Sequence, residues 1–259
     1  MSVQSANESF ELTGRVALVT GSTRGIGAAI AEEFAEAGAE VIVTGRNQSE
    51  AQDVADRIAS KGAVAHAIAY EASAKGAARD LIAALSSRVS RLDILVNNAA
   101  ILRPHRVGKL TEAEFDEVFG INTRAALFLC QEAHALLARS EAAAIVNVTA
   151  ACAHRPMAGL GAYCASKAAI INFTSTLAQE WAKDGIRVNA LTPGSVATDM
   201  ILPRDPKERA AFEEDIASQN LLGRLADPRE IARAARFLSS SAASFMTGQT
   251  LIVDGGLLA

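Results

Sequence analysis

Aromatic side chains are scarce in this chain of 259 residues: they make up 5% of the sequence, with one tryptophan and two tyrosines. Hydrophobic residues nevertheless account for 50% of it. The core must therefore be built from aliphatic side chains and alanine, which suits helices packed closely against a parallel sheet. A chain of this length is long enough to bury a sizeable core.

Cysteine is also rare, and its three copies have neither metal-type spacing nor the even number of a disulfide framework. We expect Cys130, Cys152 and Cys164 to be buried, reduced thiols. The four histidines form no HExxH-like cluster. They are His66, His105, His134 and His154. No metal site is predicted.

Long blocks of lysine and arginine are absent, and the net charge is −4. A nucleic-acid surface would need clustered cations, so we expect small-molecule partners and no nucleic acid. No run of about 18 apolar residues is present. Residues 1–11 are polar, unlike the basic and then apolar regions of a signal peptide. The sequence predicts a cytoplasmic protein that does not bind membranes.

Short apolar segments alternate with amphipathic ones along the whole chain. Strand-like runs occur at 15–20, 40–44, 63–69, 93–96, 144–148, 187–191 and 250–253. Helix-like periodicity occurs at 25–37, 49–60, 111–139 with a break expected near Gly120, 161–183 and 228–240. This alternation predicts a single α/β domain over residues 12–259, preceded by a flexible leader at 1–11.

The stretch before the last helix has a different character. Pro193, Pro203 and Pro206 interrupt it, and charged residues surround a short amphipathic piece at 207–218. Insertions beyond the carboxyl end of a strand commonly cover the site in doubly wound sheets. We therefore expect residues 195–225 to form a lid over the substrate.

Residues 15–37 have the pattern of a strand, a glycine-rich turn and a helix in direct succession. Glycine frees the dihedral angles of such a turn, lets a pyrophosphate approach the backbone and lets the helix pack close to the strand. The helix N-terminus then directs N–H groups at the phosphates. The turn residues expected to contact a dinucleotide are Gly21, Ser22, Thr23, Arg24, Gly25, Ile26 and Gly27.

A second pattern lies in the predicted helix 161–183, where Tyr163 and Lys167 are four residues apart. This spacing puts the phenol and the ammonium group on one helix face. A nearby cation favours the phenolate, so Lys167 is expected to lower the tyrosine pKa towards the range that general acid/base catalysis needs.

Five motifs follow one another along the chain. They are TGSTRGIG at 20–27, NNAA at 97–100, Asn122, YCASK at 163–167, and PG at 193–194 followed by Thr198. In this set the chain resembles the classical short-chain dehydrogenase/reductase family, over residues 12–256. The resemblance implies a doubly wound, Rossmann-type, seven-stranded parallel sheet with helices on both faces, and a nicotinamide cofactor across its edge.

The same resemblance implies roles for individual residues. Tyr163 would be the general acid/base, Lys167 would hold the nicotinamide ribose and lower the tyrosine pKa, and Asn122 would help to hold a water in the proton relay. Beyond the glycine turn, the expected cofactor contacts are Tyr163 and Lys167, then Asn98 and Ala99 on the adenosine side, and Pro193, Gly194, Val196 and Thr198 around the nicotinamide.

The chain departs from the family pattern at two positions. The usual Asn-Asn-Ala-Gly ends here in Ala100, which adds a methyl group near the cofactor. The family's catalytic serine lies thirteen residues before the tyrosine, and Ala150 occupies that position. Thr149 would replace it only if the strand end twists or bulges, because neighbouring strand residues face opposite sides. Cys152 and His154 are other candidate donors.

The choice between NAD and NADP depends on the end of the second strand. An acidic residue there would bind the ribose hydroxyls of NAD, but this chain has Gly45. Arg46 and Arg24 are available to hold a 2′-phosphate, so NADP is favoured over NAD. Glu71 is expected near the adenine, with Tyr70 as the alternative equivalent position.

The leading hypothesis is an oxidoreductase that moves a hydride between NADP(H) and a secondary alcohol or ketone. The alternative is an NAD(P)-binding protein with weak or no turnover, because of Ala150; a third is a scaffold that acts mainly as an interaction module. A homo-oligomer, tetramer or dimer, is expected from the resemblance in each case. The substrate pocket should lie among 101–109, 153–160 and 195–225.

Overall fold

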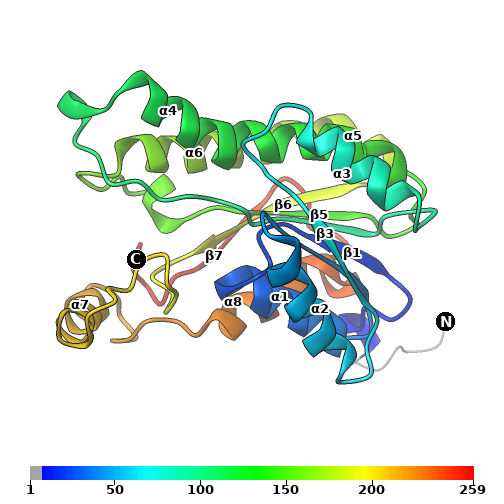
Figure 1. Cartoon of the computed structure of the whole chain (residues 1–259), viewed down its shortest axis with the longest axis horizontal. Coiled ribbons are helices and arrows are strands. Elements are labelled where there is room, and N and C mark those ends of the chain that lie inside the picture. The colour runs from blue at the N-terminus through cyan, green and yellow to red at the C-terminus, as the bar shows by residue number, and fades with distance from the viewer. Residues whose placement is uncertain (1–7) are drawn as a thin grey trace.

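Seven parallel strands form one sheet in the order β3-β2-β1-β4-β5-β6-β7 in the computed structural model, which describes residues 8–259 (Figure 1). The strands are β1 Val16–Val19, β2 Glu40–Gly45, β3 Ala65–Ala69, β4 Ile94–Asn97, β5 Ala144–Val148, β6 Arg187–Pro193 and β7 Thr250–Val253. The order reverses direction between β1 and β4, which is where ligands bind in open sheets of this kind. The predicted doubly wound, seven-stranded Rossmann-type fold is confirmed.

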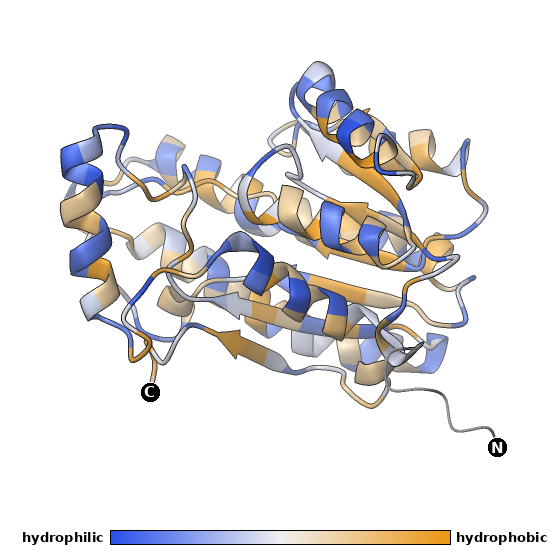
Figure 2. Cartoon of the chain, turned by 90° about the horizontal axis from the view of Figure 1, so that it is seen from below, coloured by the Kyte–Doolittle hydropathy of each residue, from blue (hydrophilic) through white to orange (hydrophobic). Residues whose placement is uncertain are grey.

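Helices cover both faces of this sheet. They are α1 Gly25–Glu36, α2 Gln48–Ala59, α3 Ala77–Ser86, α4 Glu112–Phe119, α5 Ala125–Leu137, α6 Gly161–Trp181, α7 Pro206–Ser218 and α8 Pro228–Ser239. One face is covered by α1, α2 and α8, the other by α3, α5 and α6, and each interface has its own core of aliphatic residues (Figure 1). Figure 2 shows apolar strands between helices that turn hydrophilic residues outward. None of the helices within residues 8–259 has the length and apolar character needed to cross a membrane.

The predicted long helix at 111–139 is divided, as expected, at Gly120. Thr111 caps α4 by accepting a hydrogen bond from the Glu114 amide, and the Glu114 carboxylate accepts one from the Thr111 amide. Between α4 and α5, Gly120–Arg124 forms a π-helical turn. Such turns are frequent at functional sites, and this one contains Asn122.

The predicted leader at 1–11 is described only in part. Residues 1–7 lie outside the described residues. Glu8–Phe10 forms a short 3₁₀ helix, and the Phe10 ring lies 6.2 Å from that of Phe237 on α8. Arg236 donates to the Phe10 carbonyl at 2.8 Å and forms an ion pair with Glu11 at 3.1 Å. Residues 8–11 therefore contact α8.

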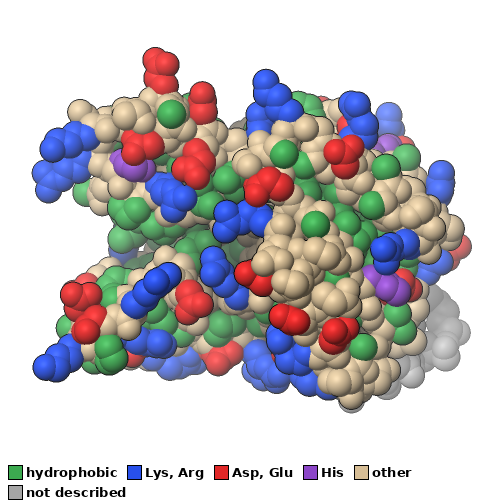
Figure 3. Space-filling model, viewed as in Figure 1, with side chains coloured by type: hydrophobic (Ala, Val, Ile, Leu, Met, Phe, Trp, Pro, Cys, Tyr) green, Lys and Arg blue, Asp and Glu red, His purple; other side chains and the backbone are tan. Residues whose placement is uncertain are grey.

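The segment 195–225 lies at the carboxyl edge of the sheet and carries α7, none of whose residues is buried. Its two ends meet in a bridge between Val196 and Ala226. Figure 3 shows a hollow between the side of the molecule that carries α4 and the side that carries α7, with hydrophobic side chains inside and Lys and Arg around its mouth. This hollow opens at the same edge as the predicted site.

Candidate active site

The glycine turn after β1 has the backbone that its sequence requires. Gly21 and Gly25 have φ angles of 62° and 56°, in the left-handed region that favours glycine. A Cβ at Gly27 would lie 2.5 Å from the Asn98 side-chain amide and would also collide with the Gly21 carbonyl. Arg24, the N-cap of α1, makes no side-chain cap. The first amides of α1 therefore lack a side-chain acceptor, which suits an anion.

Two side chains hold this turn against the end of β4. The Thr20 hydroxyl accepts from the amides of Asn98 and Ala99 at 2.9 and 3.0 Å. The Asn98 side chain donates to the carbonyls of Thr20 and Gly21 at 2.9 and 3.1 Å. Asn98 and Ala99 thus lie beside the turn and fix its shape.

Ser22 lies inside the turn, and its hydroxyl and amide are both engaged within the protein. Its hydroxyl donates to the Val19 carbonyl at 2.8 Å and accepts from the Thr44 amide at 2.9 Å, while its own amide donates to the Thr44 carbonyl. The residue is fully buried. Ser22 therefore fastens the turn to β2 rather than presenting a free group.

Arg24 and Arg46 are both exposed, and within residues 8–259 neither side chain forms an ion pair or hydrogen bond. A side chain at Gly45 would collide with the methyl group of Thr23. An acidic side chain, as expected in an NAD site, would therefore not fit at position 45 unless Thr23 moved. One oxygen of the exposed Glu71 accepts from the Ser73 hydroxyl at 2.8 Å and from its amide at 3.2 Å, so that oxygen is already engaged.

Tyr163 and Lys167 lie on α6 at the carboxyl end of β5 and are 7% and 3% exposed. The Lys167 ammonium donates to the Val148 carbonyl at 2.9 Å, and burial lowers its pKa to about 8. Burial raises the pKa of the Tyr163 phenol, and the neighbouring Cys152 and Cys164 raise it further. The predicted lowering of the tyrosine pKa is not found in this structure: desolvation of the phenolate is the main cause of the raised pKa, and Lys167 is not among the groups that shift it.

Asn122 connects the π-helical turn to two other parts of the site. Its side-chain oxygen accepts from the Ile101 amide at 2.8 Å, and its nitrogen donates to the Ile101 carbonyl at 3.0 Å and to the Ser166 hydroxyl at 3.1 Å. Ser166 in turn donates to the Tyr163 carbonyl at 2.7 Å. The loop after β4 and the helix of Tyr163 are thereby joined through one buried amide.

The residues expected around the nicotinamide follow β6. Pro193 ends the strand, and a Cβ at Gly194 would lie 2.7 Å from the backbone of Asp254. Val196 is buried, and the methyl group of Thr198 would lie 3.3 Å from a Cβ at Gly25. This segment therefore passes directly beside the glycine turn.

Comparison with known proteins gives this arrangement a family. A family model described as enoyl-(acyl carrier protein) reductase matches residues 21–258. A 3-oxoacyl-[acyl-carrier-protein] reductase of Chlamydia pneumoniae is 35% identical over 246 residues, covering 95% of this chain and 98% of that protein. The chain belongs to the classical short-chain dehydrogenase/reductase family. Members of this family are NAD(P)-dependent oxidoreductases that act on CH–OH and C=O groups.

Solved structures of other short-chain dehydrogenases/reductases are closely similar. A gluconate 5-dehydrogenase from Burkholderia cenocepacia J2315, in complex with NADP and tartrate, has a TM-score of 0.92 at 32% identity, covering 98% of both chains. A 3-oxoacyl (acyl-carrier-protein) reductase from Agrobacterium tumefaciens C58 with NADP bound has a TM-score of 0.92 at 36% identity, covering 97% of both chains.

Within this short-chain dehydrogenase/reductase fold, the strand end at Ala150 is regular. β5 keeps its pairing with β6 up to Val148, and the Thr149 hydroxyl bonds to the Leu191 carbonyl at 3.1 Å and to the Thr192 hydroxyl at 2.6 Å. Thr149 therefore faces β6 and does not replace the family's serine. The Ala150 methyl group instead packs against the cluster that contains Tyr163.

The sequence did not single out Ser166 or Thr192, although both make hydrogen bonds that order the site. Ser166 is part of YCASK, so its position beside the paired Tyr163 and Lys167 was a usable signal. The contact between Thr192 and Thr149 arises from the pairing of β5 with β6. The sequence around either threonine does not indicate which strand will pair with which. The bridge between His105 and Leu160 likewise joins two predicted pocket loops only in the fold.

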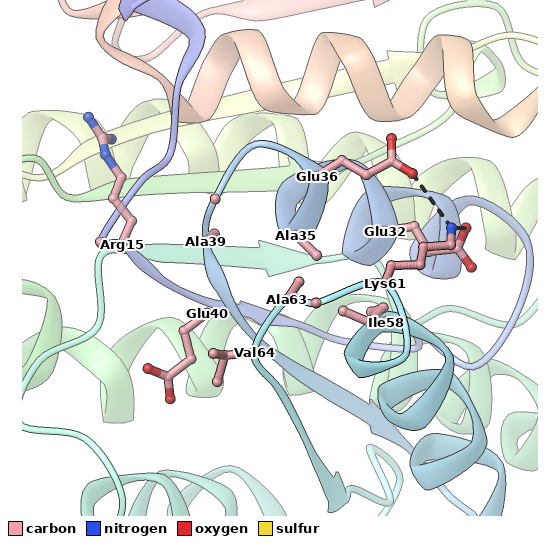
Figure 4. Close-up of a pocket in the computed structure, with 13 residues that line it drawn as sticks. Arg15, Glu32, Ala35, Glu36, Ala39, Glu40, Ile58, Lys61, Ala63 and Val64 are labelled. Carbon is pink, nitrogen blue, oxygen red and sulfur yellow. Dashed lines mark ion pairs between the residues drawn. The ribbon is translucent and has the colours of Figure 1, made fainter.

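A separate pocket of about 650 Å³ lies at the opposite, amino-terminal edge of the sheet (Figure 4). Ala35, Ile58 and Val64 contribute apolar walls, and Lys61 lies 3.6 Å from Glu36. None of the predicted site residues lines it. This pocket is not part of the candidate active site.

Proposed function

We propose that this chain is an NADP(H)-dependent oxidoreductase that interconverts a secondary alcohol and a ketone. The observation that carries the proposal is the Tyr163 and Lys167 pair, buried on one face of α6 at the sheet edge that also holds the glycine turn. A phenol and an ammonium group in a dry site can exchange a proton with a reacting oxygen. The membership of the family supports this assignment.

The chain's residues fit a nicotinamide dinucleotide phosphate. The left-handed Gly21 and Gly25 and the uncapped start of α1 suit a pyrophosphate. Arg24 and Arg46, which have no partner within residues 8–259, suit a 2′-phosphate. When bound, the nicotinamide supplies or accepts the hydride. Two solved relatives carry NADP, which supports NADP over NAD here.

Tyr163 is the proton donor in the reducing direction. Its raised pKa keeps the phenol protonated near neutral pH, so the hydroxyl gives its proton to the carbonyl oxygen as the carbonyl carbon becomes a carbinol. Lys167 stabilises the phenolate that remains and orients the ribose. Asn122 helps to hold a water through which the phenolate regains its proton. Oxidation of an alcohol uses the same groups in reverse.

The substrate pocket is proposed among 101–109, 153–160 and 195–225, with 195–225 as the lid. The first two loops are tied together by the His105 amide, which donates to the Gly159 carbonyl at 2.6 Å, and by packing of Leu102 and Leu160 beside Tyr163. Mixed polar and apolar lining favours a moderately polar carbonyl compound. A 3-oxoacyl thioester and a keto sugar acid, suggested by the names of the relatives, are the first compounds to test.

A second candidate, a cofactor-binding protein with little turnover, is favoured by Ala150 alone. NADPH binding by fluorescence, followed by NADPH oxidation with acetoacetyl-CoA and 5-keto-D-gluconate, separates the two. The proposed enzyme turns over one of them and loses turnover in Tyr163→Phe. Binding without turnover by the wild type, with turnover in Ala150→Ser, would support the second candidate.

We further propose that the chain forms a homo-oligomer through α5 and α6. The resemblance to the family motivates this proposal, and the outer side of α5 carries Phe128, which is 47% exposed. A large exposed aromatic side chain on a helix face suits a contact between subunits.

A further inference from the structure

The methyl group of Ala150 occupies the place where the family pattern has a serine hydroxyl. It packs with Cys152, Tyr163 and Cys164, so it faces the proposed catalytic centre. A ketone reduced at Tyr163 would therefore lack the second hydrogen bond that the serine gives to the reacting oxygen. Removal of one such donor typically lowers the rate by roughly 10²–10³-fold.

The hydroxyl and imidazole groups nearest to Ala150 are engaged elsewhere. Thr149 and Thr192 bond to each other at 2.6 Å, on the side of β6. His154 is exposed, and its Nε2 lies 3.3 Å from the Thr192 hydroxyl. These three residues are bonded to one another, whereas the thiols of Cys152 and Cys164 pack against Tyr163 itself, and Cys152 is the one that directly follows the turn at Ala150.

Cys152 is placed by the 3₁₀ turn Ala151–Ala153, which starts directly after Ala150. The turn is closed by a hydrogen bond from the Ala153 amide to the Ala150 carbonyl at 2.9 Å. Cys152 is 7% exposed and packs against Tyr163, in a cluster that Leu102 and Leu160 complete from the two pocket loops. Its side chain thus lies where the proposed pocket meets the phenol.

The surroundings of Cys152 also determine the protonation state of its thiol. Burial raises its pKa to about 12, and a side-chain hydrogen bond with the Cys164 thiol is the next cause of the rise. The group is therefore a protonated thiol near neutral pH. A protonated, buried thiol is a poor nucleophile and is slow to oxidise. It keeps a hydrogen, shared with the Cys164 thiol, that it can donate to a substrate oxygen in exchange for that contact.

We propose that the Cys152 thiol donates a hydrogen bond to the reacting oxygen of the substrate, in place of the hydroxyl that is missing at Ala150. The inference rests on the proposed function, since it requires a carbonyl to be reduced at Tyr163. It makes Cys152 a catalytic residue of this chain.

The test combines substitutions at the two positions. The variants are Cys152→Val, which fills the same space without a donor, Cys152→Ser, Ala150→Ser, and Ala150→Ser with Cys152→Val. Steady-state reduction of acetoacetyl-CoA and 5-keto-D-gluconate is measured together with NADPH binding and thermal unfolding. Cys130→Val, at a buried thiol in the α5 core, is the matched control.

We expect Cys152→Val to lower kcat by roughly tenfold, less than for an oxygen donor because a thiol is a weak donor. NADPH affinity should stay within about twofold, and Cys152→Ser should keep the wild-type rate within a few-fold. In the Ala150→Ser background, Cys152→Val should lower kcat by less than about threefold, since the serine then donates the hydrogen bond to the reacting oxygen. Cys130→Val should not change kcat.

An unchanged kcat in Cys152→Val, or the same loss with and without Ala150→Ser, would overturn the inference. A wild type that binds NADPH but reduces neither compound, while Ala150→Ser reduces one, would overturn it too and leave the family chemistry intact. If neither protein reduces either compound, the proposed function fails and the inference fails with it.

Discussion

Lys167 and Tyr163 lie one helical turn apart on α6, and both lose water where that helix packs beside β5. Burial has opposite effects on the two pKa values because it disfavours whichever form is charged: it lowers the lysine value to about 8 and raises the tyrosine value. Below about pH 8 the lysine is a cation and the phenol holds its proton. That pair of states is the one carbonyl reduction needs.

The pH dependence of reduction follows from these states. We expect kcat/KM for carbonyl reduction to be constant below about pH 8 and to fall above it, because Lys167 then loses its charge. In Lys167→Arg the fall should move to higher pH, since a guanidinium stays charged. Initial rates between about pH 6 and 10 check this. A rate that increases through pH 8 would contradict the assignment.

Arg24 and Arg46 are expected to decide the choice of cofactor. Replacing either by alanine should weaken NADPH binding by roughly tenfold, the effect of losing one charge-assisted hydrogen bond, and leave NADH binding unchanged. Fluorescence titration with both nucleotides measures this. Arg57→Ala is the control, since Arg57 is an exposed arginine on α2 that pairs with Glu32. Equal weakening of NADPH and NADH would exclude a 2′-phosphate contact.

At the level of elements, β1, the glycine turn and α1 act as one unit. In Gly27→Ala the added methyl group meets the Gly21 carbonyl and the Asn98 side chain, so α1 must move away from the turn. We expect a loss of roughly 1–3 kcal/mol in the free energy of unfolding and weaker NADPH binding. Gly108→Ala is the control, because a Cβ there meets nothing within 4 Å. If Gly27→Ala kept the unfolding free energy and the NADPH affinity of the wild type, the close packing of α1 on the turn would not be required.

The sequence predicted these elements well where the signal is local. The glycine turn, the one-turn spacing of Tyr163 and Lys167, and the break at Gly120 all depend on residues close together in the chain. The π-helical form of that break was not predicted, because it accompanies contacts from Asn122 to Ile101 and Ser166 that only the fold creates.

Properties that depend on many neighbouring residues could also not be predicted from the sequence. The pKa of Tyr163 depends on how completely α6 is covered, and the four-residue spacing to Lys167 indicates only the opposing effect. The hydroxyl of Ser22 accepts a hydrogen bond from β2, and the sequence of the turn does not reveal this contact. The contacts of residues 8–11 with Arg236 and Phe237 of α8 join segments more than 200 residues apart, so the sequence gives no local signal for them.

On the scale of the whole molecule, the carboxyl edge of the sheet brings together segments from residue 20 to residue 198. The aliphatic strands form the buried sheet beneath this edge, and the irregular segments after β4, β5 and β6 form the proposed pocket. Because α7 buries no residue, this helix of the proposed lid contributes little to the core. The sequence of this helix can therefore vary without changing the fold.

The proposed assembly is tested at the same scale. We expect the wild type to be a dimer or tetramer by size-exclusion chromatography with light scattering. Phe128→Glu should lower its mass, because a charge on the outer side of α5 opposes packing of a second copy. Val64→Glu, at an exposed apolar residue on the opposite edge, should not. A monomeric wild type would contradict the proposed interface.

Reduction of acetoacetyl-CoA and 5-keto-D-gluconate by NADPH, compared between the wild type and Tyr163→Phe with nucleotide binding measured on the same samples, tests the central claim most directly. We expect the wild type to oxidise NADPH with one of these compounds, and Tyr163→Phe to bind NADPH equally well but react roughly 10²–10⁴-fold more slowly. Equal turnover by the two proteins would contradict the role of Tyr163 as the proton donor.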